Sequence, residues 1–301
     1  MIEAKRYRKG TIAFAGLSGS GVAVILGCLA LIVGDIIVNG LPQLSWSFLT
    51  EAPRDGMTAG GIFPAIFGTV LLVLLMTIAV VPVGVITAVF LHEYARPDAW
   101  YARAIRSAVY NLAGIPSIVF GLFGLGFFIQ FVGGRIDSLF FGGEVVWGQP
   151  AILWASLTLA VLTLPVVIVA TEEALRTVPR ENREAALALG STPFEALWKV
   201  TLPQASPGIL TGAILAVGRG AGETAPILFT GAAYFLPYLP THPADQFMHL
   251  GYHVYVMATQ SPDIEATKPI LYGTVLVLLL VTASLNGLAV WLRYKLRRTN
   301  P

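Results

Sequence analysis

Two charged residues, Arg219 and Glu223, stand in an otherwise apolar stretch, GILTGAILAVGRGAGETAPILFTGAA (residues 208–233). The stretch is long enough to cross a bilayer, where an arginine costs about 2.5–3.5 kcal/mol on insertion scales. In a helix the two side chains would lie on one face, one turn apart, and could pair. An ion pair without a further role is one interpretation. Because apolar replacement of a buried pair is often neutral or stabilising, however, a functional role is the stronger hypothesis.

The chemistry that this pair suits is the passage of an oxyanion. A guanidinium group presents a planar fork of donors that can hold two oxygens of one anion, and a neighbouring carboxylate that competes for the fork permits release. Glycines flank both charges and leave room for a neighbouring helix or a substrate. The predicted path residues are Arg219, Gly220, Gly222, Glu223 and Thr224.

The composition identifies the class of protein that must position this pair. Of the 301 residues, 55% are hydrophobic and 12% are charged, and the mean hydropathy is +0.73. A soluble domain has about 25% charged residues, so the composition predicts an all-α, polytopic membrane protein. The single cysteine, Cys28, excludes an intrachain disulfide.

Six apolar runs are long enough to span a bilayer. They are residues 12–38, 65–91, 109–131, 152–170, 208–233 and 270–292. Most of the lysines and arginines then fall on one side of the membrane: Lys5, Arg6, Arg8, Lys9, Arg96, Arg103, Arg106, Arg176, Arg180, Arg183, Lys199, Arg293, Lys295, Arg297 and Arg298. By the positive-inside rule both termini are expected to be cytoplasmic.

The predicted organisation has three parts. Residues 1–60 form a retained anchor helix and the first extracytoplasmic loop, because the first apolar run is too long for a signal peptide. Residues 61–292 form the core, which includes a long cytoplasmic loop at about 171–206, and residues 293–301 form a basic cytoplasmic tail.

The long loop, TEEALRTVPRENREAALALGSTPFEALWKVTLPQAS, predicts two short helices. Pro179 suits the first turn of one helix and Gly190 its C-terminal cap. Thr192 and Glu195 form a capping box around Pro193 at the start of the second. Pro203 is expected to end that helix, and Ser206–Pro207 to begin the fifth span.

An apolar face on the second helix, with Phe194, Leu197 and Trp198, is open to two interpretations. It suits a docking contact with another protein, because it is rimmed by charge. It would equally suit packing against the cytoplasmic ends of this chain's own spans. Local physics alone does not separate the two.

The loop resembles the EAA motif of ABC-importer permeases. That pattern is E-A-A, three residues, G, nine residues, then I-x-L-P, and it is matched in EAALALGSTPFEALWKVTLP (residues 184–203), with Val200 in place of the usual Ile. The resemblance implies that the loop is a coupling helix docked in a cleft of a separate ATPase subunit. The expected coupling residues are Glu184, Ala185, Ala186, Gly190, Ser191, Thr192, Pro193, Leu202 and Pro203.

Three further strings resemble the permeases of phosphate importers, and among them the PstA family. They are GGIFPAIFGT (residues 60–69), LAGIPSIVFGLFGLGF (112–127) and RGAGETAP (219–226). The resemblance implies a type I importer fold in a bacterial-type cytoplasmic membrane. It also implies a sister permease, two copies of an ATPase and an extracytoplasmic phosphate-binding protein as partners.

Phosphate also agrees with the chemistry of the charged pair, because at neutral pH it keeps a proton that can be donated to Glu223, whereas sulfate has none. Two alternatives stay open: a permease for another solute (sulfate, molybdate or an amino acid), and an ion-driven transporter or channel. The chain has no P-loop, nucleophile elbow or H-E-x-x-H motif. We therefore expect no catalysis, cofactor, bound metal or nucleic-acid partner of its own, with ATP and Mg²⁺ held by the partner ATPase.

Several other polar residues are candidates for a functional role. His249 and His253, with Asp245 nearby, could form a metal site, but an interfacial segment is the favoured interpretation. The pair His92–Glu93 is expected to be solvated at the inner end of the second span. Asp35 is expected to reach water. A last group is predicted to kink helices: Pro82, Pro116, Pro165 and Pro226.

Overall fold

The computed structural model describes the backbone of residues 2–96, 98–261 and 263–299, and the side chains of 14–55, 57–96, 98–261 and 263–295. The basic side chains predicted at 5–9, 297 and 298 lie outside this part. Six stretches are long and apolar enough to cross a membrane, which confirms the predicted number. They are Phe14–Gln43, Phe63–Tyr94, Ser117–Phe140, Ile152–Arg176, Pro193–Gly222 and Ile264–Lys295.

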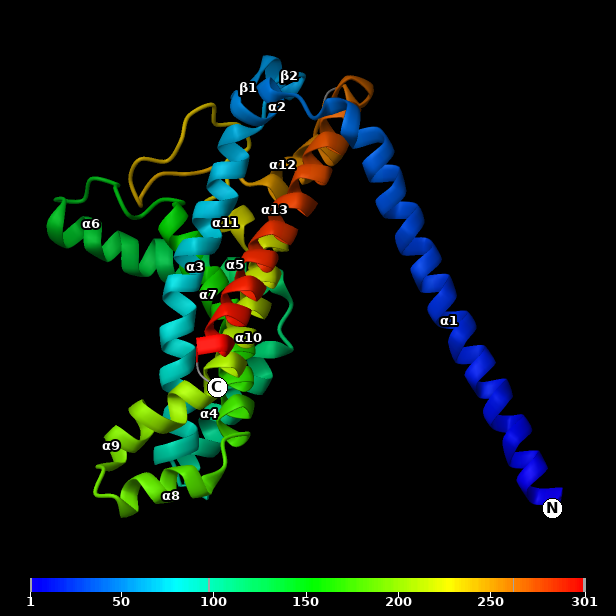
Figure 1. Cartoon of the computed structure of the whole chain (residues 1–301). Helices are drawn as coiled ribbons and strands as arrows, with labels where there is room; N and C mark the ends of the chain where they lie inside the picture. Colours follow the sequence, from blue (N-terminus) through cyan, green and yellow to red (C-terminus); the bar gives the residue numbers. More distant parts are fainter. Residues whose placement is uncertain (1, 97, 262, 300–301) are drawn as a thin grey trace.

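The fold is almost entirely helical (Figure 1). The α-helices are α1 (Ile2–Gly40), α2 (Trp46–Thr50), α3 (Phe63–Val89), α4 (Trp100–Ala113), α5 (Ser117–Phe123), α6 (Gly134–Phe140), α7 (Ile152–Arg176), α8 (Arg180–Ala188), α9 (Pro193–Ala196), α10 (Leu202–Gly222), α11 (Ile227–Thr230), α12 (Leu250–Thr259) and α13 (Ile264–Thr299). Two 3₁₀ turns, η1 (Leu41–Gln43) and η2 (Asp55–Met57), and three π segments, η3 (Phe90–Tyr94), η4 (Gly124–Gly133) and η5 (Leu197–Thr201), connect them.

The two ends of the molecule differ in structure. At one end, β1 (Pro53–Arg54) and β2 (Ala59–Gly60) form a small antiparallel hairpin beside α2. At the other end lie α4, α8 and α9 (Figure 1). The long helices run between these ends, so the β1–β2 hairpin at one end and helices α4, α8 and α9 at the other are separated by the length of the spans.

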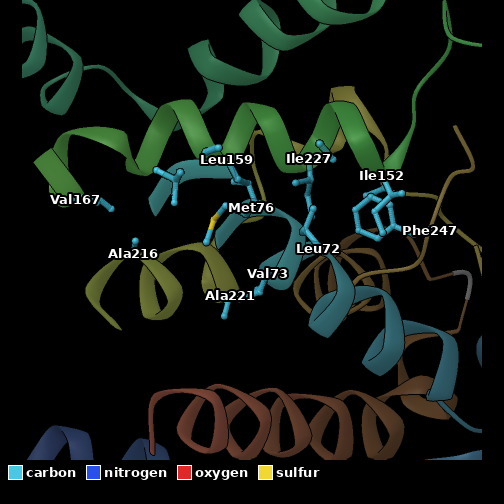
Figure 2. Packing of buried hydrophobic residues seen from close by; sticks show 14 residues of the cluster. Leu72, Val73, Met76, Ile152, Leu159, Val167, Ala216, Ala221, Ile227 and Phe247 are labelled. Carbon is cyan, nitrogen blue, oxygen red and sulfur yellow. The ribbon is translucent and has the colours of Figure 1, made fainter. Parts of the chain in front are cut away.

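The core lies where α3, α7 and α10 pack together (Figure 2). Leu72 and Met76 of α3 meet Leu159 of α7 and Ala221 of α10, and all four are buried. Small residues allow close approach of the backbones: a Cβ added at Gly212 of α10 would lie 2.8 Å from Cβ of Ala170. Such contacts are typical of helix pairs in membranes.

Over most of its length, helix α1 lies apart from the other helices (Figure 1). Near its end it contacts α13, because the hydroxyl of Tyr272 donates to Asp35 Oδ2 at 2.9 Å. Within α1, the side-chain amide of Asn39 donates to the other carboxylate oxygen, Asp35 Oδ1, at 2.8 Å. Asp35 is exposed, as expected, but it also joins two helices. Most described side chains of α1 are exposed, although the helix is strongly apolar.

The predicted third span begins too early. Residues 100–113 form the separate amphipathic helix α4, and the spanning segment starts at Ser117. Gly114 and Pro116 interrupt the helical structure between α4 and the spanning segment, since the residue before a proline is disfavoured in a helix. Pro116 and Pro226 therefore precede short helices and do not kink long ones, whereas Pro82 and Pro165 lie inside α3 and α7 as predicted.

The predicted fifth span, 208–233, is shifted. Helix α10 starts at Leu202 and ends at Gly222, and Glu223 has extended backbone with φ −79° and ψ 124°. A flexible glycine before the break and Pro226 after it, which lacks an N–H donor, explain why the apolar run does not continue as one helix.

Pro203 does not end the second loop helix. Helix α9, η5 and α10 form one continuous helical stretch, Pro193–Gly222. Pro203 takes an early position in α10, and the π segment η5 before it accommodates the backbone hydrogen bond that proline cannot donate. Ser206 and Pro207 consequently lie inside α10 and do not start it.

Gly68 allows α3 to approach the chain before α12. A Cβ at this position would collide with the carbonyl oxygen of Met248, next to the hydrogen bond from the Leu250 N–H to Thr69 Oγ1 (2.9 Å). We expect Gly68→Ala to destabilise the protein by about 1–3 kcal/mol, as overpacking does. The measurement is thermal unfolding in detergent. The matched control is Gly126→Ala, which meets no described atom within 4 Å; equal stability of the two variants would contradict this packing.

Candidate functional site

Arg219 and Glu223 form the predicted ion pair, although not within one helix. Arg219 Nε lies 3.3 Å from Glu223 Oε1; Arg219 is in the last turn of α10 and Glu223 directly follows its end. Their side chains are 38% and 21% exposed. The pair therefore lies at a partly exposed corner of the chain, and within the described residues Glu223 contacts the guanidinium group through its Nε.

The pair lies level with the middle of α3, at the point where α10 ends. Gly220 packs directly against the sulfur of Met76, the central residue of α3. On the other side, a Cβ added at Gly218 would lie 3.0 Å from Oδ1 of Asn286 in α13. A partly open arginine at this depth is the pattern expected of a passage site.

The other predicted path residues have different surroundings. Gly222 is exposed and no described atom lies within 4 Å of its potential Cβ, so it borders open space. Gly220 is buried against Met76 and serves helix packing. Thr224 is half-buried, and its Oγ1 lies 2.6 Å from the potential Cβ of Gly251, at the start of α12. Their roles toward a solute stay predictions.

The two histidines are buried. His249 caps α12, because its Nδ1 accepts the N–H groups of Gly251 (3.1 Å) and Tyr252 (3.4 Å). Burial lowers the pKa of both His249 and His253 to about 4, so both are neutral at neutral pH. The two side chains are thus enclosed by the protein itself, and the interfacial position of their segment stays a prediction.

Asp245 serves a turn. Its Oδ2 accepts the N–H groups of His242 (2.7 Å) and Thr241 (2.8 Å), which lower the pKa of this carboxyl below its ordinary value. Within the described residues no group of three potential metal ligands occurs.

The long loop folds into a helical bracket, which we define as residues 180–203. Gly190 ends α8 with φ +90°; its N–H donates to the Leu187 carbonyl (3.0 Å) and that of Ser191 to the Ala186 carbonyl (3.1 Å). This pair of bonds is the Schellman arrangement that favours glycine. The capping box of Thr192 and Glu195 forms as predicted, and Pro179 lies one residue earlier than predicted, at the N-cap of α8.

The bracket exposes apolar side chains at its outer surface. Phe194 and Trp198 stack at 6.3 Å between ring centroids, each 63% exposed, and Leu189 is 88% exposed. Leu197, predicted to share this face, is instead buried. One side of the second helix therefore packs inward against this chain, and the other is exposed; docking of another protein on the exposed side stays a prediction.

The residues of the EAA pattern divide in the same way. Glu184, Ala185, Gly190, Thr192 and Pro193 are exposed, whereas Ala186, Ser191, Leu202 and Pro203 are partly buried.

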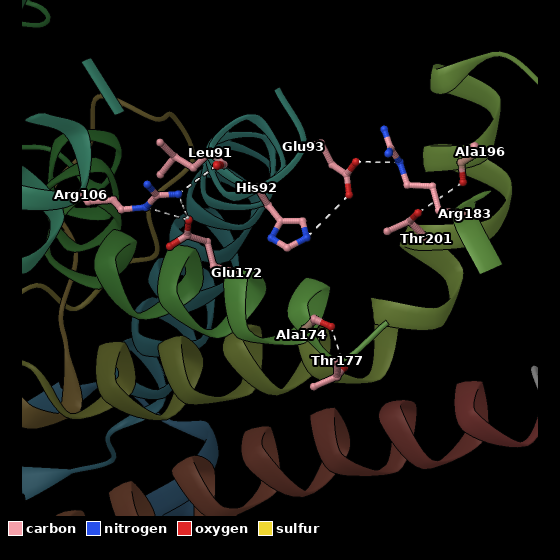
Figure 3. Close-up of polar contacts among 10 residues, drawn as sticks. All are labelled: Leu91, His92, Glu93, Arg106, Glu172, Ala174, Thr177, Arg183, Ala196 and Thr201. Atoms are coloured by element: carbon pink, nitrogen blue, oxygen red, sulfur yellow. Dashed lines mark hydrogen bonds and ion pairs between the residues drawn. The ribbon is translucent and has the colours of Figure 1, made fainter. Parts of the chain in front are cut away.

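Behind the bracket lies a set of ion pairs that the sequence did not predict (Figure 3). Arg183 Nε of α8 lies 3.0 Å from Glu93 Oε2 of η3, and Glu93 Oε1 lies 3.8 Å from His92 Nε2. The Glu93 side chain is only 8% exposed, so the expectation that it is solvated is wrong. Its partner lies 90 positions away along the chain, and no local signal joins them.

Comparison with known proteins agrees with this fold. A family model described as "Binding-protein-dependent transport system inner membrane component" matches residues 80–298. The "Probable ABC transporter permease protein YqgI" of Bacillus subtilis (strain 168) is 34% identical over 290 residues, 92% of each chain. The "Probable phosphate transport system permease protein PstA" of Methanocaldococcus jannaschii is 32% identical over 263 residues, 87% of this chain and 86% of that protein. PstA of Yersinia pestis is 36% identical over 230 residues, 76% and 72%.

Among solved structures, a chain of a bacterial alginate ABC transporter, crystallised in complex with an alginate pentasaccharide-bound periplasmic protein, superposes with a TM-score of 0.65. The identity is 16%, and the match covers 95% of this chain and 94% of that one, so this likeness concerns the fold. The chain is thus a multi-pass membrane protein that belongs to the family of binding-protein-dependent transport system inner membrane components, the permeases of ABC importers.

Proposed function

We propose that the chain is the permease subunit of an ATP-driven importer of inorganic phosphate and forms half of its path. The observation that carries the proposal is the partly open Arg219–Glu223 pair at the depth of the middle of α3. The phosphate-permease names of the relatives support the choice of solute.

The geometry of the pair suits weak, reversible binding. Glu223 contacts only Nε of Arg219, at 3.3 Å, so the outer guanidinium nitrogens are available to two oxygens of one phosphate. Since a passage site must release its solute, a carboxylate competing for the same cation limits the affinity. Glu223 also accepts the proton that phosphate carries and sulfate lacks.

Glu223 therefore provides a test of selectivity. We expect Glu223→Gln to reduce phosphate uptake by about tenfold, equivalent to about 1.4 kcal/mol, and Glu223→Asp to reduce it less, because only Asp keeps the competing charge. The measurement is radiolabelled uptake by cells, with sulfate as competitor. A larger effect of Glu223→Asp would rule out the proposed role of the charge.

The exposed surfaces of this chain indicate where its partners would bind. The exposed outer side of the bracket suits an ATPase in the cytoplasm, where ATP and Mg²⁺ would be held, and this chain would be non-catalytic. The opposite end, with α2 and the β1–β2 hairpin, suits the phosphate-binding protein. The exposed apolar length of α1 suits a sister permease within the bilayer. Basic residues around α4 and α8 favour a cytoplasmic bracket and cytoplasmic termini in a bacterial-type inner membrane.

Reconstitution tests this function. The chain is purified with its native partners and placed in liposomes, and ATP hydrolysis is measured with the phosphate-loaded binding protein. We expect stimulation by phosphate and not by sulfate, molybdate or amino acids. Stimulation by one of those solutes would favour the other-solute alternative, and gradient-driven uptake by vesicles that contain this chain alone would favour a secondary transporter.

A further inference from the structure

The second half of the bracket, α9 and η5, continues as a helix into α10, whereas α8 is attached to the spanning helices by few polar contacts. None of the residues of α8 is buried. Among the described residues, two side-chain contacts join α8 to the spans: the Asn182 amide donates to Gln204 Oε1 of α10 (2.8 Å), and Arg183 pairs with Glu93 of η3, which continues α3 (3.0 Å). The second contact is the one that connects the bracket to a different spanning helix (Figure 3).

Glu93 is suited to hold such a connection. Its side chain is 8% exposed, and a carboxylate in that position depends on its cationic partner. It belongs to η3, where the Ala95 N–H donates to the Phe90 carbonyl (2.8 Å) in the wider π pattern. π segments are frequent at functional sites, because their looser ladder can shift register.

The same end of α3 is fixed to two other helices. Arg106 of α4 donates to the Leu91 carbonyl (3.0 Å) and to Glu172 Oε1 of α7 (3.3 Å). Glu172 is likewise nearly buried. These contacts join the end of the α3 span to α4 and α7. A displacement of Glu93 would therefore be transmitted to all three helices.

Helix α3 leads from this junction to the transport site. Met76, 17 positions before Glu93 in the sequence, packs against Gly220, next to Arg219. Thr69, another seven positions earlier, holds the start of α12 through the Leu250 N–H. Contiguous helix packing thus joins the bracket to both sides of the corner where Arg219 and Glu223 lie.

We propose that the Arg183–Glu93 ion pair is the link through which movement of the bracket is transmitted to α3 and the Arg219–Glu223 site. The pair acts as a positioning device and touches neither solute nor nucleotide. The inference rests on the proposed function, because the movement is driven by the partner ATPase.

The test is the number of phosphate ions imported per ATP hydrolysed by the complete complex in liposomes. Arg183→Gln, Glu93→Gln and the double variant are compared with the wild type, with Arg183→Lys as the variant that keeps the charge. The matched control is Glu173→Gln, which removes an exposed ion pair with Arg176 (2.8 Å) next to Glu172 on α7.

Each neutral single variant is expected to import about tenfold less phosphate per ATP, within the roughly 5- to 150-fold range of coupling between sites. The ATPase should remain bound and hydrolyse ATP within about twofold of the wild type. The double variant should be no worse than either single variant, because both remove one interaction. Arg183→Lys and Glu173→Gln should keep near-normal ratios.

An unchanged ratio in Arg183→Gln, or uptake and hydrolysis falling in parallel, would overturn the proposal and leave a structural ion pair. If Glu93→Gln fails to assemble, the more exposed Arg183 still decides the outcome. The wild-type complex distinguishes failure of this inference from failure of the proposed function. If the unmodified complex shows no ATP-driven phosphate uptake, the proposed function itself is wrong.

Discussion

Replacing Arg219 by alanine is expected to reduce phosphate uptake by about a hundredfold in a complex that still inserts and assembles. Two charge-assisted hydrogen bonds to the anion would be lost, together about 3 kcal/mol, and Glu223 would remain as an unpaired carboxylate that repels phosphate. The measurement is initial uptake of labelled phosphate, normalised to the amount of assembled complex.

Two control variants test whether the effect depends on the bidentate geometry of the guanidinium group at this position. Arg219→Lys keeps the positive charge and loses the bidentate geometry, so intermediate uptake is expected. Arg135→Ala removes an exposed arginine of α6 whose guanidinium lies 4.9 Å from the centroid of the Phe131 ring, outside the proposed site and docking surfaces, and should leave uptake near normal. Undiminished uptake in Arg219→Ala would end the proposal that this residue lines the path.

The second large effect is expected at Gly190. With φ +90° its backbone is in a region that a β-branched residue adopts only with strain of about 1–3 kcal/mol, and α8 has few polar contacts to resist the distortion. We expect Gly190→Val to displace α8 relative to α9, so that less ATPase co-purifies and uptake falls at least about tenfold.

Open space around Gly190 makes this a test of backbone conformation alone, since no described atom lies within 4 Å of a Cβ added there. Gly190→Asn is the matched variant, because asparagine tolerates the left-handed region far better than valine. It should retain ATPase binding and most of the uptake. If the Val and Asn variants behave alike, the turn does not set the geometry of the docking surface.

The parts of the structure that the sequence predicted correctly are governed by local rules. The capping box of Thr192 and Glu195 and the left-handed Gly190 depend on residues within a single turn, and both are present. The number of spans also follows locally, because each apolar run must cross the bilayer by itself.

The misplaced elements involve competing local signals. Pro203 resembles a helix end, but the π turn η5 before it lets the helix continue into α10. The run 208–233 is apolar throughout, yet the chain turns at Glu223, between Gly222 and Pro226. Hydropathy cannot distinguish a continuous helix from a broken one that is sheltered inside the protein.

The interactions that sequence analysis missed are long-range. Glu93 is adjacent to a histidine at the end of an apolar run, which favours a solvated position, and only the packing of α8 against η3 brings Arg183 to it. The burial of His249, at the N-cap of α12, similarly depends on how the segment that connects α11 to α12 packs in the folded protein. Pairings across such distances leave no local pattern in the sequence.

The most direct test of the account is cross-linking from the bracket. Single cysteines are placed at the exposed positions Ala185, Leu189 and Trp198, in a chain whose native Cys28 is replaced by serine. A short bifunctional reagent is then applied to native membranes. The account predicts that each cysteine captures a nucleotide-hydrolysing protein. If cysteines that react freely with a cytosolic thiol reagent never capture such a protein, the bracket is not held by an ATPase and the assignment as an ATP-driven permease is contradicted.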